Sequence, residues 1–243
     1  GIEGLNHPED YAEFDMEFLP KNAEPSPKTT EIFRKNELAA RKLLTDRGFD
    51  WAKNIYLGNM VKPYHEHNLE WTIDAALEFI EDSKDEPFYL HFCTTLVHGP
   101  DAEWYSSMQT PLYSGEGQLE APIQPEGMLS RKAILAELKK RGLDPAKGHA
   151  GYSWVDAGVG AILQKLKKLG LDDNTLIFFT ADHGSMMKGS LWDLNGSCVP
   201  FIARWPKGIK AGSENSDLVQ SIDIAATAYE LAGVDLPKEY QLD

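Results

Sequence analysis

Residues 155–184 read VDAGVGAILQKLKKLGLDDNTLIFFTADHG, and this stretch predicts a helix, a turn and a strand in succession. Its apolar residues recur at steps of three and four, which places them on one helix face; they are Val155, Val159, Ile162, Leu166 and Leu169. Lysines fill the last turns, where the helix dipole favours cations, and Gly170 ends the helix. The run 175–181, TLIFFTA, is short and apolar, as in a strand buried on both faces.

The same alternation extends outward in both directions. We expect helices over 29–47, 71–81, 129–140 and 222–232, and buried strands over 88–95 (FYLHFCTT) and 199–204 (VPFIAR). Residues 99–127 are rich in Pro, Gly, Ser and Glu, which predicts a long loop excursion. Apolar strands that alternate with helices favour an α/β fold, with a mostly parallel sheet sandwiched between helices.

Composition narrows the class of protein. The 243 residues carry a formal net charge of −14, with 42% hydrophobic and 26% charged residues, as in an ordinary soluble globular protein. This length suits one large domain, 1–243. The acidic balance argues against a nucleic-acid partner, and no apolar run is long enough to span a bilayer. Two cysteines exclude a disulfide framework.

Polar side chains follow two of the expected strands. His98 comes after 88–95, and Asp182 and His183 come directly after 175–181. Active-site groups in α/β sheets gather at the carboxyl ends of strands. An adjacent Asp and His can bind one divalent cation, and Lys188, one loop further on, can neutralise a bound anion.

Structural interpretations compete with these functional ones. An isolated Asp-His-Gly is also typical of a turn, and a single His such as His98 is also typical of a hydrogen-bonded surface or core residue. His65 and His67 have the spacing of two ligands on one strand face, but they lie between Pro63 and a helix. For that pair the structural or solvent-exposed interpretation is favoured.

Four segments resemble the sulfatases, which belong to the alkaline phosphatase-like superfamily. They are HNLEWTIDAALEFIEDSKDEPFYLHFCTTLVHGP (67–100), LDDNTLIFFTADHG (171–184), KGSLWDLNGSCVPFIARWPKGIKAGS (188–213) and LVQSIDIAATAYELAGVDLP (218–237). They occur in the family's order and resemble the central and later part of its catalytic domain. The resemblance implies the alkaline phosphatase-like α/β fold.

The resemblance also implies roles for individual residues. Asp182 and His183 match metal ligands, and the metal of sulfatases is usually calcium. Many members have Asn at the position of His183; an imidazole is a soft ligand for calcium, which keeps zinc open as an alternative. Lys188 matches a lysine that contacts the sulfate oxygens. His98 matches a histidine that binds sulfate and protonates the leaving group.

Further along, the resemblance places Trp192 and Asn195 at the border of the substrate pocket. The nucleophile of the sulfatases is a formylglycine made from the Cys or Ser of a C/S-x-P-x-R segment. The 243 residues contain no such segment: Cys198-Val199-Pro200 comes near it, but Ile202 stands in place of the arginine. We therefore expect this chain to be a fragment, inactive alone, with the nucleophile encoded before Gly1.

The function expected for the complete protein is sulfuric ester hydrolysis. By resemblance, its substrates are small-molecule or carbohydrate sulfate esters, and family habit suggests a periplasmic or extracellular location. A zinc-dependent phosphatase or phosphodiesterase of the same superfamily is one alternative. A non-catalytic pseudoenzyme or binding module is another.

Overall fold

The computed structural model describes residues 8–19, 23–57, 63–184, 190, 192 and 194–234. Lys188 lies outside the described residues. The chain divides into two compact units, residues 1–169 and 170–243, and each is described by itself. The prediction of a single catalytic domain over 1–243 stays a prediction.

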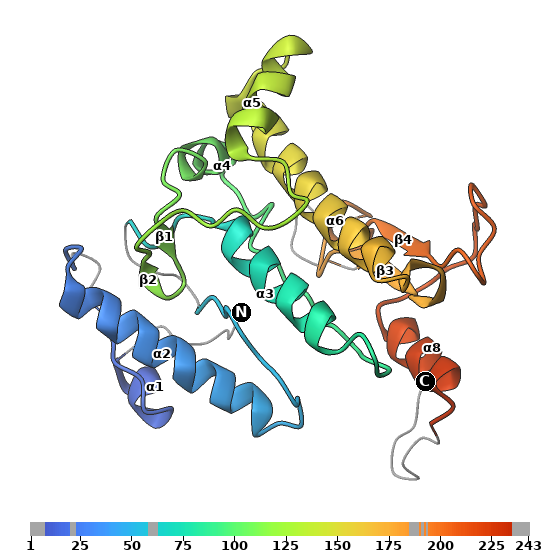
Figure 1. Ribbon diagram of the computed structural model, residues 1–243, viewed down its shortest axis with the longest axis horizontal. Helices are drawn as coiled ribbons and strands as arrows, with labels where there is room; N and C mark the ends of the chain where they lie inside the picture. Colours follow the sequence, from blue (N-terminus) through green and yellow to red (C-terminus); the bar gives the residue numbers. More distant parts are fainter. Residues whose placement is uncertain are drawn as a thin grey trace. The chain divides into compact units, whose positions relative to one another are not determined.

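Helices dominate the first unit (Figure 1). Its helices are α1 (Pro8–Glu13), α2 (Pro27–Thr45), α3 (Leu69–Asp82), α4 (Asp101–Ser107), α5 (Arg131–Lys140), the π-helical turn η1 (Pro145–His149) and α6 (Ala150–Lys168). Strands β1 (Tyr113–Ser114) and β2 (Gly117–Gln118) form a small antiparallel hairpin. The expected loop excursion over 99–127 thus contains α4 and this hairpin.

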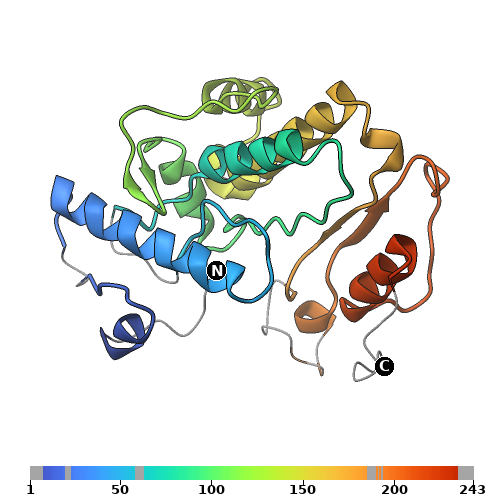
Figure 2. The same cartoon turned by 60° about the horizontal axis from the view of Figure 1, so that its bottom comes forward.

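Helices α3 and α6 pack side by side and form the main core of the first unit (Figures 1 and 2). Leu69, Ile73 and Leu77 of α3 share one apolar cluster with Trp154 and Ala161 of α6. Each large apolar side chain buried in this way contributes about 1.5–3 kcal/mol relative to exposure. Apolar residues that recur with helical periodicity in both segments are therefore buried at this contact.

A polar cap starts α3. The Asn68 side chain accepts a hydrogen bond from the Trp71 amide at 3.2 Å, which satisfies one of the free N–H groups of the first turn. Its Nδ2 donates to the carbonyls of Pro111 and Tyr113, at 3.1 and 2.9 Å. The start of α3 is therefore tied to the segment that leads into the hairpin.

The second unit contains the elements η2 (Asp172–Asn174), β3 (Ile177–Thr180), α7 (Leu194–Ser197), β4 (Phe201–Arg204) and α8 (Ile222–Ala232). Strands β3 and β4 pair antiparallel, with Ile177 opposite Arg204 and Thr180 opposite Phe201. Gly233, in the left-handed region at φ 65°, ends α8 as a C-terminal cap.

The expected parallel sheet is not confirmed. Both ladders among the described residues are antiparallel and two-stranded, and the expected strand 88–95 is not part of either. A strand exists only through hydrogen bonds to a neighbouring strand, so an apolar run alone does not create one. Tyr89 is 61% exposed in this segment, whereas Phe92 packs against the main core. Within the described residues, no helix is long and apolar enough to cross a membrane.

Candidate functional site

Asp182 and His183 follow strand β3 and lie close to each other. His183 Nδ1 is 2.7 Å from the carbonyl oxygen of Gly184, and a carbonyl can only accept, so Nδ1 carries the proton. In the neutral ring Nε2 then presents a lone pair, and it lies 3.5 Å from Asp182 Oδ2. Two electron-rich atoms that face each other at this distance can share one cation.

The loop after β3 packs closely against α7. The Gly184 amide donates to the Gly196 carbonyl at 2.8 Å, and a side chain at Gly184 would overlap the backbone of Asn195. Only glycine fits this close approach. Asn195 therefore lies in the segment next to the Asp182–His183 pair.

Exposure differs among the residues of the second unit. The Asp182 side chain is 85% exposed and that of His183 is 32% exposed. Trp192 is 96% exposed. Among the described residues, no group of three or more His, Cys, Asp or Glu could hold a metal ion.

His98 lies in the first unit, on the turn that leads into α4. Its backbone is firmly held: its amide donates to the Thr95 carbonyl at 3.0 Å, and its carbonyl accepts from Trp104 Nε1 at 2.7 Å. Trp104 is only 3% exposed, and Leu96 in the same turn belongs to the main core. The His98 side chain itself is exposed. The turn thus combines a fixed backbone with an accessible imidazole.

His67 is the functional candidate that sequence reasoning set aside. It is 8% exposed, and its Nδ1 lies 2.8 Å from Thr95 Oγ1. Burial, followed by the nearby His98 and His65, lowers the pKa of His67 to about 4. The ring also hydrogen-bonds to the backbone of His98, which by itself raises this pKa. The sequence signal for His67 was its spacing with His65, and the structure adds its position just before the helix cap Asn68.

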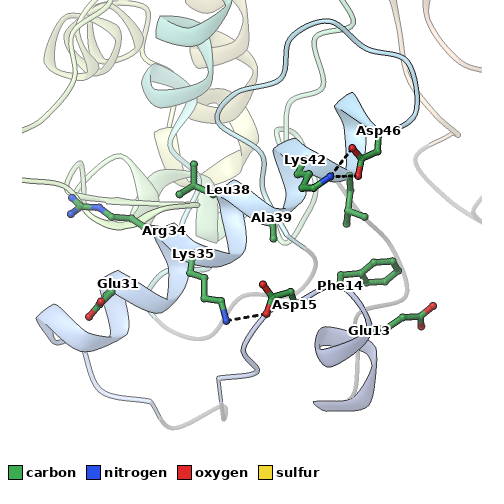
Figure 3. A pocket seen from close by; sticks show the side chains of 11 residues that line it. Glu13, Phe14, Asp15, Glu31, Arg34, Lys35, Leu38, Ala39, Lys42 and Asp46 are labelled. Carbon is green, nitrogen blue, oxygen red and sulfur yellow. Dashed lines mark hydrogen bonds and ion pairs between the residues drawn. The ribbon is translucent and has the colours of Figure 1, made fainter.

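A groove of about 730 Å³ lies between α1 and α2 (Figure 3). Phe14, Leu38 and Ala39 supply apolar lining. Two of its cations are already paired: Lys35 with Asp15 at 3.5 Å, and Lys42 with Asp46 at 2.6 Å. None of the residues predicted to act on substrate lines this groove.

Comparison with known proteins identifies the family to which the chain is similar. The family described as Sulfatase matches residues 21–234. An N-acetylglucosamine-6-O-sulfatase of Bacteroides thetaiotaomicron is 32% identical over 151 residues, which cover 54% of this chain and 26% of that protein. An arylsulfatase of Hemicentrotus pulcherrimus is 29% identical over 196 residues, which cover 73% of this chain and 29% of that protein. An ulvan-active sulfatase of Formosa agariphila is 44% identical over 75 residues, which cover 31% of this chain and 15% of that protein.

The chain spans less than a third of the length of each of these relatives. The family match itself covers most of the chain, from before α2 to the end of α8. It includes the turn that carries His98 and the loop that carries Asp182 and His183. The chain belongs to the sulfatase family.

Proposed function

We propose that the protein containing this chain hydrolyses sulfate esters. Family membership and the order of the four motif segments support the reaction class. The observation that carries it within the structure is the Asp182–His183 pair, with His183 Nε2 and Asp182 Oδ2 turned toward each other. Both donors follow β3, on a loop that Gly184 holds against α7.

The donor set fits a divalent metal ion. Asp182 would supply a carboxylate oxygen and His183 its Nε2, because the Gly184 carbonyl fixes the ring proton on Nδ1. A bound cation supplies positive charge that stabilises negative charge on sulfate oxygens. Family habit favours calcium, and the imidazole keeps zinc as the alternative.

Two further residues of this chain have roles in the proposal. His98, exposed on a fixed backbone, donates a proton to the oxygen of the departing alcohol. Lys188 neutralises charge on the sulfate oxygens. Trp192 and Asn195 border the substrate. A formylglycine nucleophile, encoded outside these 243 residues, completes the machinery, so the chain alone is expected to be inactive.

The substrate class proposed is a sulfated carbohydrate or aryl sulfate. Relatives carry the names N-acetylglucosamine-6-O-sulfatase, ulvan-active sulfatase and arylsulfatase. Exposed Trp192 offers an aromatic face of the kind that packs against a sugar ring. The mostly parallel sheet of the alkaline phosphatase-like fold belongs to the same proposal, and the strand-like composition of the run 88–95 (FYLHFCTT) supports it.

The test is aryl sulfate turnover by the complete gene product. We expect His98→Ala and Lys188→Ala each to lower kcat/KM by about 100-fold or more. Lys140→Ala serves as control: it also removes one lysine, whose side chain is 80% exposed and has no role in the proposal, and turnover should be unchanged. Wild-type turnover in both site variants would refute the assignment. No turnover in the wild type would favour a non-catalytic module.

A zinc-dependent phosphatase is the second candidate, and the orientation of the His183 ring favours it. An imidazole with Nδ1 bonded to a carbonyl and Nε2 left to act as the donor atom is a typical zinc ligand. Metal content of the purified complete protein discriminates between the two. One calcium per chain supports sulfate ester hydrolysis, and two zinc ions per chain support phosphate ester chemistry.

A further inference from the structure

The geometry points to His67 as a positioning residue that holds the 95–98 turn and thereby orients the His98 imidazole. This inference rests on the proposed function of His98 and goes beyond it. His67 touches the turn at two places: its Nδ1 contacts the Thr95 hydroxyl at 2.8 Å, and its ring bonds to the His98 backbone.

A neutral imidazole satisfies both contacts at once. It has one N–H to donate and one nitrogen that accepts. The contact with the His98 backbone raises the His67 pKa, which identifies the ring as donor there, so Nδ1 accepts the proton of the Thr95 hydroxyl. Burial keeps the ring neutral at pH 7, because it lowers the pKa of His67 to about 4.

His67 is itself anchored in the fold. Its backbone amide donates to Ser107 Oγ at 3.0 Å, and that hydroxyl donates to Glu66 Oε2 at 2.7 Å. Arg131 Nη1 donates to the Ser107 carbonyl at 2.8 Å. Ser107 is fully buried at the end of α4, so His67 is fixed between the start of α3 and the end of α4.

The His98 backbone is thus held from two sides. Trp104 Nε1 donates to its carbonyl at 2.7 Å, and the His67 ring provides the second contact. Trp104 also forms part of the main core. Orientation by buried, preorganised groups is what an exposed proton donor needs, because misplacement by about 1 Å can cost roughly 100-fold in rate.

The test is a double-mutant cycle in the complete gene product, with kcat on an aryl sulfate and urea unfolding measured for each variant. We expect His67→Ala to lower kcat by about tenfold when His98 is present and by less than about twofold in the His98→Ala background. The reason is that His67 acts through His98, so its effect disappears when His98 is absent.

Thr95→Val covers the case in which His67→Ala fails to fold. It keeps the shape of the side chain, removes the hydroxyl that faces His67, and should lower kcat by about threefold, again only when His98 is present. Thr72→Val is the matched control: Thr72 is 8% exposed, and its hydroxyl donates within α3 to the Leu69 carbonyl. Its kcat should equal that of the wild type.

Equal losses of kcat with and without His98 would overturn the inference while leaving the proposed function intact. Unchanged turnover in His98→Ala would refute the proposed function instead. Hydrogen exchange of the Trp104 indole and the His98 amide provides a readout that is independent of activity. Both should exchange faster in Thr95→Val than in Thr72→Val, and equal rates would contradict a positioning role.

Discussion

Glu70 and Arg131 form an ion pair inside the first unit, with side chains 3% and 11% exposed. The pair is bidentate, with Arg131 Nε 3.0 Å from Glu70 Oε1 and Arg131 Nη2 2.7 Å from Glu70 Oε2. Trp154 Nε1 also donates to Glu70 at 3.0 Å, and the guanidinium lies 4.5 Å from the Trp154 ring centroid. This network links α3, α5 and α6.

Arg131→Met should destabilise the chain by about 3–5 kcal/mol, because it leaves the Glu70 carboxylate buried without its partner. Adding Glu70→Gln to this variant should recover part of the loss, since the uncompensated charge disappears. Lys140→Ala breaks an exposed pair and should cost less than about 1 kcal/mol. Urea unfolding measures all three, and equal costs for Arg131→Met and Lys140→Ala would contradict the importance of burial.

His67 gives the first unit a predictable pH dependence. Its pKa is about 4 in the folded chain and 6.5 unfolded, so between these values the unfolded state binds the extra proton. The stabilising contribution is complete above pH 6.5 and is lost as pH falls toward 4, a total of about 3 kcal/mol. His65, His98 and Glu66 are the titratable groups nearest to it.

We expect the difference in unfolding free energy between wild type and His67→Asn to shrink over this window. The comparison removes contributions from other titrating groups, which both proteins share. Urea unfolding at pH 7, 5.5 and 4.5 provides the measurement. A difference that stays constant with pH would show that His67 titrates normally in the folded protein.

Helix α6 contains glycines in two different environments. Gly160 has open space where a side chain would lie, so Gly160→Ala should stabilise the chain by about 0.5–1 kcal/mol through helix propensity. At Gly151 a side chain would overlap the Trp104 ring, so Gly151→Ala should destabilise it and loosen the turn at His98. Thermal unfolding of both variants checks this, and the same sign for both would contradict the packing described.

Helices α6 and α8 should differ strongly in protection from hydrogen exchange. Seven residues of α6 are buried, whereas α8 has none and leaves Ile222 and Leu231 about half exposed. Protection follows the free energy needed to open a segment, which rises with the apolar surface that opening exposes to water. We expect amides of α6 to exchange at least about 100-fold more slowly than those of α8. Similar protection would mean that α8 is covered in solution.

Helices were more predictable from the sequence than strands. The pattern predicted helices over 71–81 and 222–232, and the structure has Leu69–Asp82 and Ile222–Ala232, because a helix makes its hydrogen bonds within one segment. The runs 175–181 and 199–204 do contain β3 and β4, but their antiparallel pairing was not foreseen. Pairing depends on which segment comes alongside, and periodicity carries no such information.

The candidate site was predictable only in part. Asp182 and His183 stood out because a polar pair follows an apolar run, and the structure brings their donor atoms to 3.5 Å. That run was expected to form a buried strand, but β3 is only partly covered and Phe179 is 41% exposed. His67 was considered together with His65 and set aside, because the role proposed for it arises from Thr95, Ser107 and the His98 backbone, which are distant in sequence. Lys188 stays a prediction from motif resemblance, since it lies outside the described residues.

The chain as a whole is acidic, with a net charge of −14, and this charge disfavours anions at most of its surface. An anionic ester therefore needs local positive charge, which the proposal assigns to Lys188, His98 and a cation at Asp182 and His183. Family membership covers residues 21–234, while the chain spans less than a third of each relative cited. The activity proposed here is therefore that of the complete gene product.

Release of inorganic sulfate and phosphate from 4-nitrophenyl sulfate and 4-nitrophenyl phosphate by the complete gene product is the decisive measurement, because the two esters differ only in the transferred group. Sulfate ester hydrolysis predicts that sulfate release exceeds phosphate release by at least about 100-fold in kcat/KM, and that His98→Ala abolishes most of it. Faster release of phosphate, with no dependence on His98, would contradict it.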